Sequence, residues 1–143
     1  MFQLAKAYRY NKSLVGRPDI STFPRKTVKQ KSGTGERLRI GYVSSDLRDH
    51  AVGFALREVL ELHDKASVEI YAYYCGDPVR NVATQTRMKN AVDCWREIST
   101  LSDEDAARHT SSDDIYILFD VNCYSIHSPI RIFASHPAPY IPY

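Results

Sequence analysis

The stretch LRIGYVSSDLRDHAVG, residues 38–53, decides the fold of this chain. A short apolar run at residues 40–43 ends in two serines and Asp46, and a helical pattern of apolar residues begins near Gly53. The order is strand, polar loop and helix. In open α/β sheets, ligands bind in the crevice beyond the carboxyl ends of such strands. The loop holds two hydroxyls, two carboxylates, an arginine and His50, so we expect chemistry at this turn.

The alternation of strand and helix continues along the chain. Expected strands cover residues 38–43, 68–74, 95–98 and 115–119, and expected helices cover residues 52–62, 82–92, 103–109 and 129–134. Ser102 and Asp105 have the spacing of a capping box, which predicts the start of a helix at residue 103. The apolar run IYILF, residues 115–119, is typical of a buried parallel strand. The pattern predicts an α/β fold with a Rossmann-like, partial parallel sheet of about four strands and flanking helices.

Three parts follow one another along the chain. We expect a short helix in residues 1–15, an irregular basic linker in residues 16–37 and an incomplete globular lobe in residues 38–143. The last part ends in three prolines without a further strand, so we expect an open edge of the sheet. The first 39 residues hold ten lysines and arginines against two acidic residues, although the whole chain carries a net charge of only +2.

The basic charge allows two interpretations. An arm that binds nucleic acid would need aromatic residues among its charges to stack on bases, and none lies between Arg25 and Arg39. We therefore favour a solvated linker and expect no nucleic acid among the partners. An affinity for nucleic acid that collapses as the salt concentration rises would favour the other interpretation.

Composition excludes several classes of protein. With 143 residues, 43% of them hydrophobic, the chain can fill a core, which argues against general disorder. No apolar run approaches the roughly 20 residues of a membrane helix, and the first residues lack the apolar centre of a secretory signal. The three cysteines form no CxxC pair, which predicts neither a zinc site nor a disulfide framework. We expect a cytoplasmic protein that does not contact a membrane.

Polar side chains gather in two loops, each directly after an expected strand. The first loop holds Ser44, Ser45, Asp46 and His50, and the second holds Asp120, Asn122, Tyr124 and His127. Neighbouring parallel strands would bring both loops to one edge of the sheet, with His50 and Asp120 facing one crevice. A neutral histidine can take a proton from an attacking hydroxyl, and a nearby carboxylate can orient it or stabilise its charged form. Asn122 offers a donor and an acceptor for sugar or peptide groups.

Simpler interpretations of the same residues stay open. A histidine in a polar loop is commonly a surface or capping residue, and an aspartate after a strand is commonly a turn former or a helix cap. His63 and His109 stand near the ends of expected helices, where they complement the helix dipole. The sequence contains neither a glycine-rich phosphate-binding fingerprint nor an HExxH motif. We therefore expect neither an ordinary nucleotide-binding loop nor a catalytic metal.

An ordered set of segments resembles a known family. The segments RLRIGYVSSDLRDHAVGFALREVLELHD, VEIYAYYCG, STLSDEDAARH, DDIYILFDVNCYS and RIFASHPAP are similar, in this order, to the catalytic region of O-linked N-acetylglucosamine (O-GlcNAc) transferases, including the SPINDLY group. The similarity covers about residues 38–139. It implies the first lobe of a two-lobed glycosyltransferase that moves N-acetylglucosamine from UDP-GlcNAc to Ser and Thr hydroxyls of acceptor proteins. Tetratricopeptide repeats usually precede such a region, and residues 1–15 would then be the end of that array.

The resemblance also implies roles for the residues of both loops. In the family the histidine at the position of His50 lies at the active site and has been considered a base. His50 and Asp120 are accordingly the expected catalytic residues, and Asn122 and Tyr124 are expected to bind substrate. The resemblance implies no cofactor: the donor UDP-GlcNAc is a substrate that the second lobe mainly binds.

Four features depart from the family pattern, and the first is the lack of a second histidine that many bacterial members have near the position of Phe54. Cys123 stands where the family usually has a glycine, whose freedom to adopt positive φ is lost. His136 replaces the arginine of an RPAP element, a cation that is always charged. The second lobe, which holds most of the UDP-sugar contacts in the family, has no counterpart in this sequence. We therefore expect this chain alone to lack transferase activity, and the alternative is a non-catalytic protein-interaction module derived from the same lobe.

Overall fold

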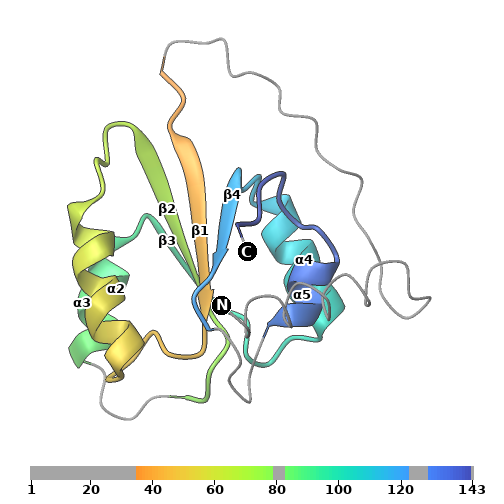
Figure 1. Ribbon diagram of the computed structural model, residues 1–143, viewed down its shortest axis with the longest axis horizontal. Coiled ribbons are helices and arrows are strands. Elements are labelled where there is room, and N and C mark those ends of the chain that lie inside the picture. The colour runs from red at the N-terminus through yellow and green to blue at the C-terminus, as the bar shows by residue number, and fades with distance from the viewer. Residues whose placement is uncertain (1–34, 79–82, 123–128, 143) are drawn as a thin grey trace.

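The computed structural model describes residues 35–78, 83–122 and 129–142 (Figure 1). The elements in chain order are β1 (Leu38–Ser44), α2 (Ala51–Leu62), β2 (Val68–Tyr74), α3 (Ala83–Ala91), β3 (Cys94–Glu97), α4 (Asp103–Ser112), β4 (Ile117–Asp120) and α5 (Ile130–Ala134). Every strand and helix expected within these residues is present, and the largest difference is at α4, which ends at Ser112 rather than at His109. The expected helix in residues 1–15 and residues 16–34 of the expected linker lie outside the described residues.

The four strands form one parallel sheet in the order β3-β2-β1-β4. The strand β1 lies between β2 and β4, and its central residues are buried. Apolar residues fill both faces of β1 and β2, as expected for parallel strands covered on both sides. The register pairs Val43 with Asp120 and Ser44 with Tyr74. The carboxyl ends of β1, β2 and β4 therefore lie at one edge of the sheet.

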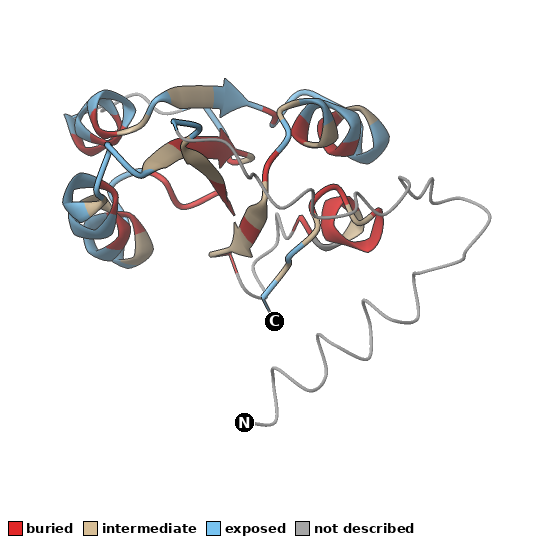
Figure 2. Ribbon diagram, turned by 90° about the horizontal axis from the view of Figure 1, so that it is seen from above, coloured by how far each residue is buried: buried red, intermediate tan, exposed pale blue. Residues whose placement is uncertain are grey.

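Two helices cover each face of the sheet (Figures 1 and 2). On one face, Leu56 and Leu60 of α2 and Met88 of α3 pack in a cluster with Tyr42 of β1. On the other face, α4 and α5 pack in a second cluster, which includes Val43, Tyr71, Tyr73, Leu118 and Phe133. Burial of side chains such as Leu60 stabilises the fold by about 1.5–3 kcal/mol each. The α/β fold with flanking helices is thus the one expected.

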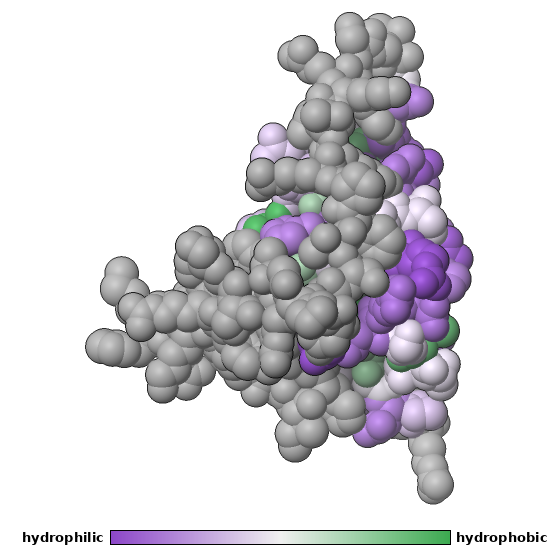
Figure 3. Space-filling model, turned by 90° about the vertical axis from the view of Figure 1, so that its right-hand side faces the viewer, coloured by the Kyte–Doolittle hydropathy of each residue, from purple (hydrophilic) through white to green (hydrophobic). Residues whose placement is uncertain are grey.

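Helix α4 begins as the capping box predicts. The Ser102 hydroxyl oxygen accepts a hydrogen bond of 3.1 Å from the Asp105 backbone N–H. The outward face of α4 is charged, and on it Arg108 forms an ion pair with Glu104 at 3.1 Å. The space-filling view of the side on which α4 and α5 lie shows mainly hydrophilic side chains among the described residues (Figure 3).

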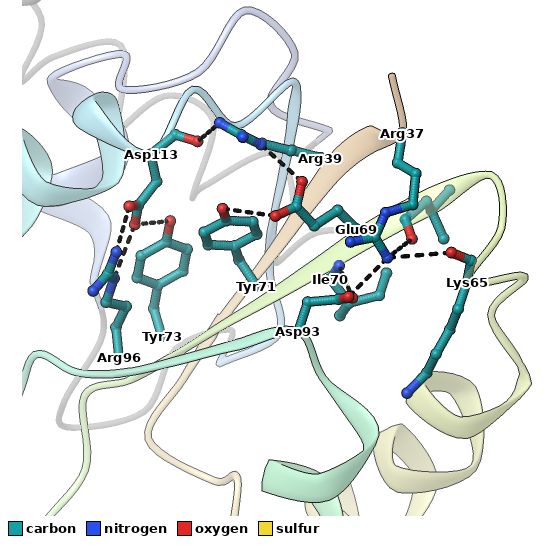
Figure 4. A network of polar contacts seen from close by, with 11 residues as sticks. Arg37, Arg39, Lys65, Glu69, Ile70, Tyr71, Tyr73, Asp93, Arg96 and Asp113 are labelled. Carbon is teal, nitrogen blue, oxygen red and sulfur yellow. Dashed lines mark hydrogen bonds and ion pairs between the residues drawn. The ribbon is translucent and has the colours of Figure 1, made fainter. Parts of the chain in front are cut away.

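A polar network, visible in no motif of the sequence, ties the strands to the surrounding loops (Figure 4). Arg37 contacts the Asp93 carboxylate at 2.7 Å, and the same carboxylate accepts the Ile70 backbone N–H at 2.9 Å. Farther along β2, the Tyr73 hydroxyl donates to Asp113 at 2.8 Å, and Arg96 donates twice to that carboxylate, at 2.7 and 3.2 Å. Burial raises the pKa of Tyr73 well above its usual range, and the adjacent carboxylate adds to the shift. The phenol is therefore a neutral hydrogen-bond donor in the fold.

The edge of the sheet at β4 is contacted by one residue, Tyr140, and the described residues add no fifth strand there. Tyr140 forms a parallel bridge with Ile117. Its N–H donates to the carbonyl of Tyr116 at 3.1 Å, and its own carbonyl accepts the Leu118 N–H at 2.9 Å. Tyr140, which directly follows Pro139, thus continues the ladder without forming a strand. Among the described residues, none of the helices has the length and apolar character needed to cross a membrane.

Candidate functional site

Both polar loops leave the sheet at the same edge. The Val121 N–H donates to the carbonyl of Val43 at 3.1 Å, which continues the β1–β4 pairing past the end of β4. On the other side of β1, the Cys75 N–H donates to the carbonyl of Ser44 at 3.1 Å. The first loop therefore lies between the end of β2 and the second loop. This edge is where ligands bind in open α/β sheets.

Asn122 fastens the second loop to the first. Its side-chain oxygen Oδ1 accepts hydrogen bonds from the Ser44 hydroxyl at 3.1 Å, the Ser45 N–H at 2.8 Å and the Ser45 hydroxyl at 2.6 Å. Its backbone N–H donates to the Asp120 carboxylate at 2.9 Å. Asn122 is only 5% exposed, so these contacts are shielded from water. The side-chain oxygen of Asn122 is thus engaged within the protein, and substrate binding by Asn122 stays a prediction.

Of the other predicted residues of the second loop, the structure describes Asp120 alone. Tyr124, predicted to bind substrate, lies outside the described residues, as do Cys123 and His127. Asp120, predicted to be catalytic, is the last residue of β4 and stands at the edge described above. Its role in catalysis stays a prediction.

His50 is the N-cap of α2. Its contacts are therefore those of a capping residue, which is the simpler interpretation given above. Its backbone is extended, with φ −153° and ψ 156°, and its ring nitrogen Nδ1 accepts a hydrogen bond of 3.3 Å from the Val52 N–H. Its backbone carbonyl accepts the Phe54 N–H at 2.9 Å. The side chain remains 43% exposed, which leaves it accessible to a ligand. The expected role of His50 in catalysis stays a prediction.

The carboxylate that the structure places against the His50 ring is that of Asp46. Asp46 Oδ2 lies 3.7 Å from His50 Nδ1, and Oδ1 lies 3.3 Å from a guanidinium nitrogen of Arg48. The Asp46 side chain is 11% exposed, and its backbone N–H donates to the Ser44 hydroxyl at 3.0 Å. Burial of a carboxylate is costly without a charged partner, and Arg48 supplies one. Sequence reasoning placed Asp46 in the loop but gave it no part in the site.

Two glycines allow the first loop to pack closely, and sequence reasoning missed both. A Cβ on Gly53 would lie 2.0 Å from the carbonyl oxygen of Arg48 and 2.8 Å from that of Asp46. A Cβ on Gly76, just beyond β2, would lie 2.4 Å from the carbonyl oxygen of Ser45. Backbone atoms occupy the space of a side chain at both positions. A glycine in the first turn of a helix was the available signal, since glycine is otherwise unfavourable there.

Cys75 lies at the same edge but is not activated. Burial raises the pKa of its thiol to about 12, and the negative charges of Asp120 and Asp46 add to the shift. A thiol is nucleophilic only as the thiolate, so Cys75 is inert at neutral pH. Among the described residues, no group of three or more His, Cys, Asp or Glu side chains is arranged to hold a metal ion.

Known proteins match this chain over most of its length. A model of glycosyl transferase family 41 matches residues 13–141. A probable UDP-N-acetylglucosamine–peptide N-acetylglucosaminyltransferase SEC of Arabidopsis thaliana is 30% identical over 118 residues, which are 82% of this chain and 12% of that protein. A UDP-N-acetylglucosamine–peptide N-acetylglucosaminyltransferase of Caenorhabditis elegans is 34% identical over 108 residues, which are 73% of this chain and 9% of that protein.

A solved structure has the same fold. A mutant of the Thermobaculum terrenum O-GlcNAc transferase superposes with a TM-score of 0.71 and 33% sequence identity, over 97% of this chain and 25% of that chain. A probable SPINDLY transferase of Solanum lycopersicum is 26% identical over 87% of this chain and 14% of its own length. The chain thus spans only about a tenth of the length of these curated relatives.

Proposed function

This chain belongs to glycosyl transferase family 41, and on that premise we propose that it forms part of the first lobe of an O-GlcNAc transferase. The resemblance found in the sequence is confirmed by the family match and by the solved structure with the same fold. The names of the relatives specify a UDP-N-acetylglucosamine donor and a peptide acceptor. In our proposal the same donor and protein acceptors serve the enzyme to which this lobe contributes, in the cytoplasm.

One observation carries this proposal. The two loops with the predicted site residues meet at one edge of a sheet whose fold matches an O-GlcNAc transferase, and Asn122 joins them by three hydrogen bonds. The His50 side chain at that edge is 43% exposed and is therefore accessible to a ligand. The proposed site is therefore one wall of a sugar-transfer pocket, and a second lobe supplies the other.

The proposed reaction is a direct displacement at the anomeric carbon of the donor. The oxygen of a Ser or Thr hydroxyl forms the new bond to that carbon, while the bond to the diphosphate oxygen breaks and its electron pair leaves with UDP. The hydroxyl proton passes to a base. His50 would receive this proton or orient the hydroxyl, and Asp120, Asn122 and Tyr124 would shape the acceptor side. The second lobe would stabilise the departing UDP, and no cofactor is required.

A segment exchange tests the proposal. We would replace the matching segment of the Thermobaculum terrenum O-GlcNAc transferase with this chain and measure transfer of radiolabelled GlcNAc to a peptide. We expect activity in the exchanged enzyme, its loss in His50→Ala, and no turnover by the chain alone. Leu62→Ala, at a position 83% exposed, is the matched control and should stay active. A folded but inactive exchange would contradict the proposal.

The alternative is a protein-interaction module without catalysis. Three apolar side chains of α2 are exposed, namely Phe54 at 47%, Val59 at 45% and Leu62 at 83%, and such residues can contribute to protein contacts. Titration of the chain with labelled UDP-GlcNAc separates the two functions. Half of a sugar-transfer site should bind the donor weakly, whereas a module that only contacts proteins should not bind it at all.

A further inference from the structure

The ring nitrogen Nδ1 of His50 lies between two groups that require opposite protonation states. The Val52 N–H is 3.3 Å from Nδ1 and donates to it. The Asp46 oxygen Oδ2 is 3.7 Å from Nδ1. An ionised carboxylate accepts hydrogen bonds but cannot donate them. Without a hydrogen, Nδ1 can accept the hydrogen bond of the amide, and with a hydrogen it can donate one to the carboxylate. The same nitrogen cannot do both at once.

Two observations indicate that Nδ1 accepts from the Val52 N–H and does not donate to Asp46, namely the two distances and the other contacts of each partner. A separation of 3.3 Å is a long hydrogen bond, while 3.7 Å lies outside the range of one. The Val52 N–H belongs to the first turn of a helix, where no carbonyl of the helix can reach it, so the cap supplies a partner. Asp46 does not depend on His50, because Arg48 already pairs with it at 3.3 Å.

The packing of the loop holds the backbone of Asp46. Gly53 lies directly against the carbonyl oxygens of Asp46 and Arg48, which seats the backbone of the loop on the first turn of α2. The Asp46 N–H is in turn held by the Ser44 hydroxyl at 3.0 Å. The backbone of Asp46 is therefore held both by the first turn of α2 and by the Ser44 hydroxyl.

We propose that neutral His50 carries its hydrogen on Nε2 and offers that N–H to an oxygen of the bound substrate, as a hydrogen-bond donor rather than as the base. This inference rests on the proposed function for the identity of the substrate, and it decides between the two roles left open above. A donated hydrogen bond orients the substrate and moves no proton. Asp46 is then a positioning residue, which acts through the loop and not through the ring.

The protonated nitrogen can be identified by NMR. We would record long-range 1H–15N correlations of the imidazole rings in the 15N-labelled chain, about two pH units above the ordinary histidine pKa of about 6.5. His50→Asn, which keeps an N-cap oxygen, identifies the signals of His50 among the five histidines. We expect a pyrrole-type nitrogen at Nε2 and a pyridine-type nitrogen at Nδ1. A reversed or averaged pattern would overturn the proposal.

Asp46→Asn tests the part assigned to Asp46, with Asp49→Asn, at an exposed neighbouring position, as the matched control. Both variants should keep the hydrogen on Nε2, and a switch to Nδ1 in Asp46→Asn alone would show that the carboxylate sets the tautomer, against our proposal. The spectra require neither donor nor transfer activity. Failure of the tautomer assignment is thus distinct from failure of the proposed function, which the segment exchange tests.

Discussion

The Asn122 side-chain oxygen and the Ser45 hydroxyl are joined by a hydrogen bond of 2.6 Å, although 77 positions separate them in the sequence. Two further donors reach the same oxygen, and all of these groups are buried. A buried amide that accepts three bonds holds two loops in one arrangement. The geometry of the candidate site therefore depends on Asn122 more than on any other side chain of the second loop that the structure describes.

Asn122→Ala should destabilise the protein by about 3 kcal/mol, because it leaves the buried hydroxyls of Ser44 and Ser45 and an N–H without their acceptor. Chemical denaturation measures the free energy of unfolding. Asn122→Asp keeps an oxygen at the same place and should cost less. The matched control is Asn90→Ala on the exposed side of α3, which should change stability by no more than about 0.5 kcal/mol.

Gly53→Ala should be destabilising although alanine is the better helix former. The added methyl group would meet the carbonyl oxygen of Arg48 at 2.0 Å, so the loop or the helix must move. We expect a loss of about 1–3 kcal/mol in the free energy of unfolding, the usual cost of overpacking. Helix propensity alone predicts a gain of about 1 kcal/mol. An unchanged or raised stability would show that the loop does not pack against this glycine.

Asp93 should make stability depend on pH in the acid range. Burial raises the pKa of the Asp93 carboxyl. The hydrogen bond from the Ile70 N–H and the contact with the Arg37 guanidinium both lower this pKa, and together they outweigh burial. The net effect is a lowered pKa. The folded value thus lies below the unfolded value of about 3.9. The contribution is present above the unfolded pKa and is lost as the pH falls through the folded pKa.

The variant Asp93→Asn should therefore lose stability at neutral pH and show a weaker acid dependence than the wild type. Thermal unfolding from pH 7 down to about pH 3 would measure both. Asp77→Asn, at an exposed carboxyl, provides the comparison. Parallel curves for Asp93→Asn and the wild type would contradict the assignment.

Cys75 should resist alkylation in the folded protein. Because burial raises the pKa of its thiol to about 12, almost no thiolate is present at pH 8. Mass spectrometry after treatment with iodoacetamide at about pH 8 would compare the folded and urea-unfolded chain peptide by peptide. We expect fast labelling of Cys75 only after unfolding, and equal rates in both states would contradict the buried, protonated thiol.

The strands and helices could be predicted because their signals are local. The bounds of β2 follow from the alternation of apolar residues, and the start of α4 follows from Ser102 and Asp105. The meeting of the two loops could also be anticipated, because the carboxyl ends of neighbouring parallel strands share an edge. The family resemblance rested on an ordered set of segments that includes both loops, and it was confirmed.

Other features depend on contacts between distant segments, which no local pattern reveals. The bond between Tyr73 and Asp113 needs the end of α4 to lie over β2, and the close approach at Gly53 needs the loop to fold back on α2. The pairing of Tyr140 with β4 was missed because the neighbouring prolines lack an N–H and argue against a strand. The N–H and the carbonyl of Tyr140 alone extend the hydrogen-bond pattern of the sheet beyond β4.

Arg37 determines where the chain enters the sheet. Its guanidinium donates to the carbonyl of Lys65 and to Asp93 just before β1 begins, which is the end of the strand remote from Ser44. The seven residues of β1 span about 23 Å at 3.3 Å each. A fluorophore, affinity handle or surface tether placed ahead of Arg37 therefore joins the sheet a full strand length from the candidate site, and so offers a way to immobilise the protein with that edge of the sheet facing solution.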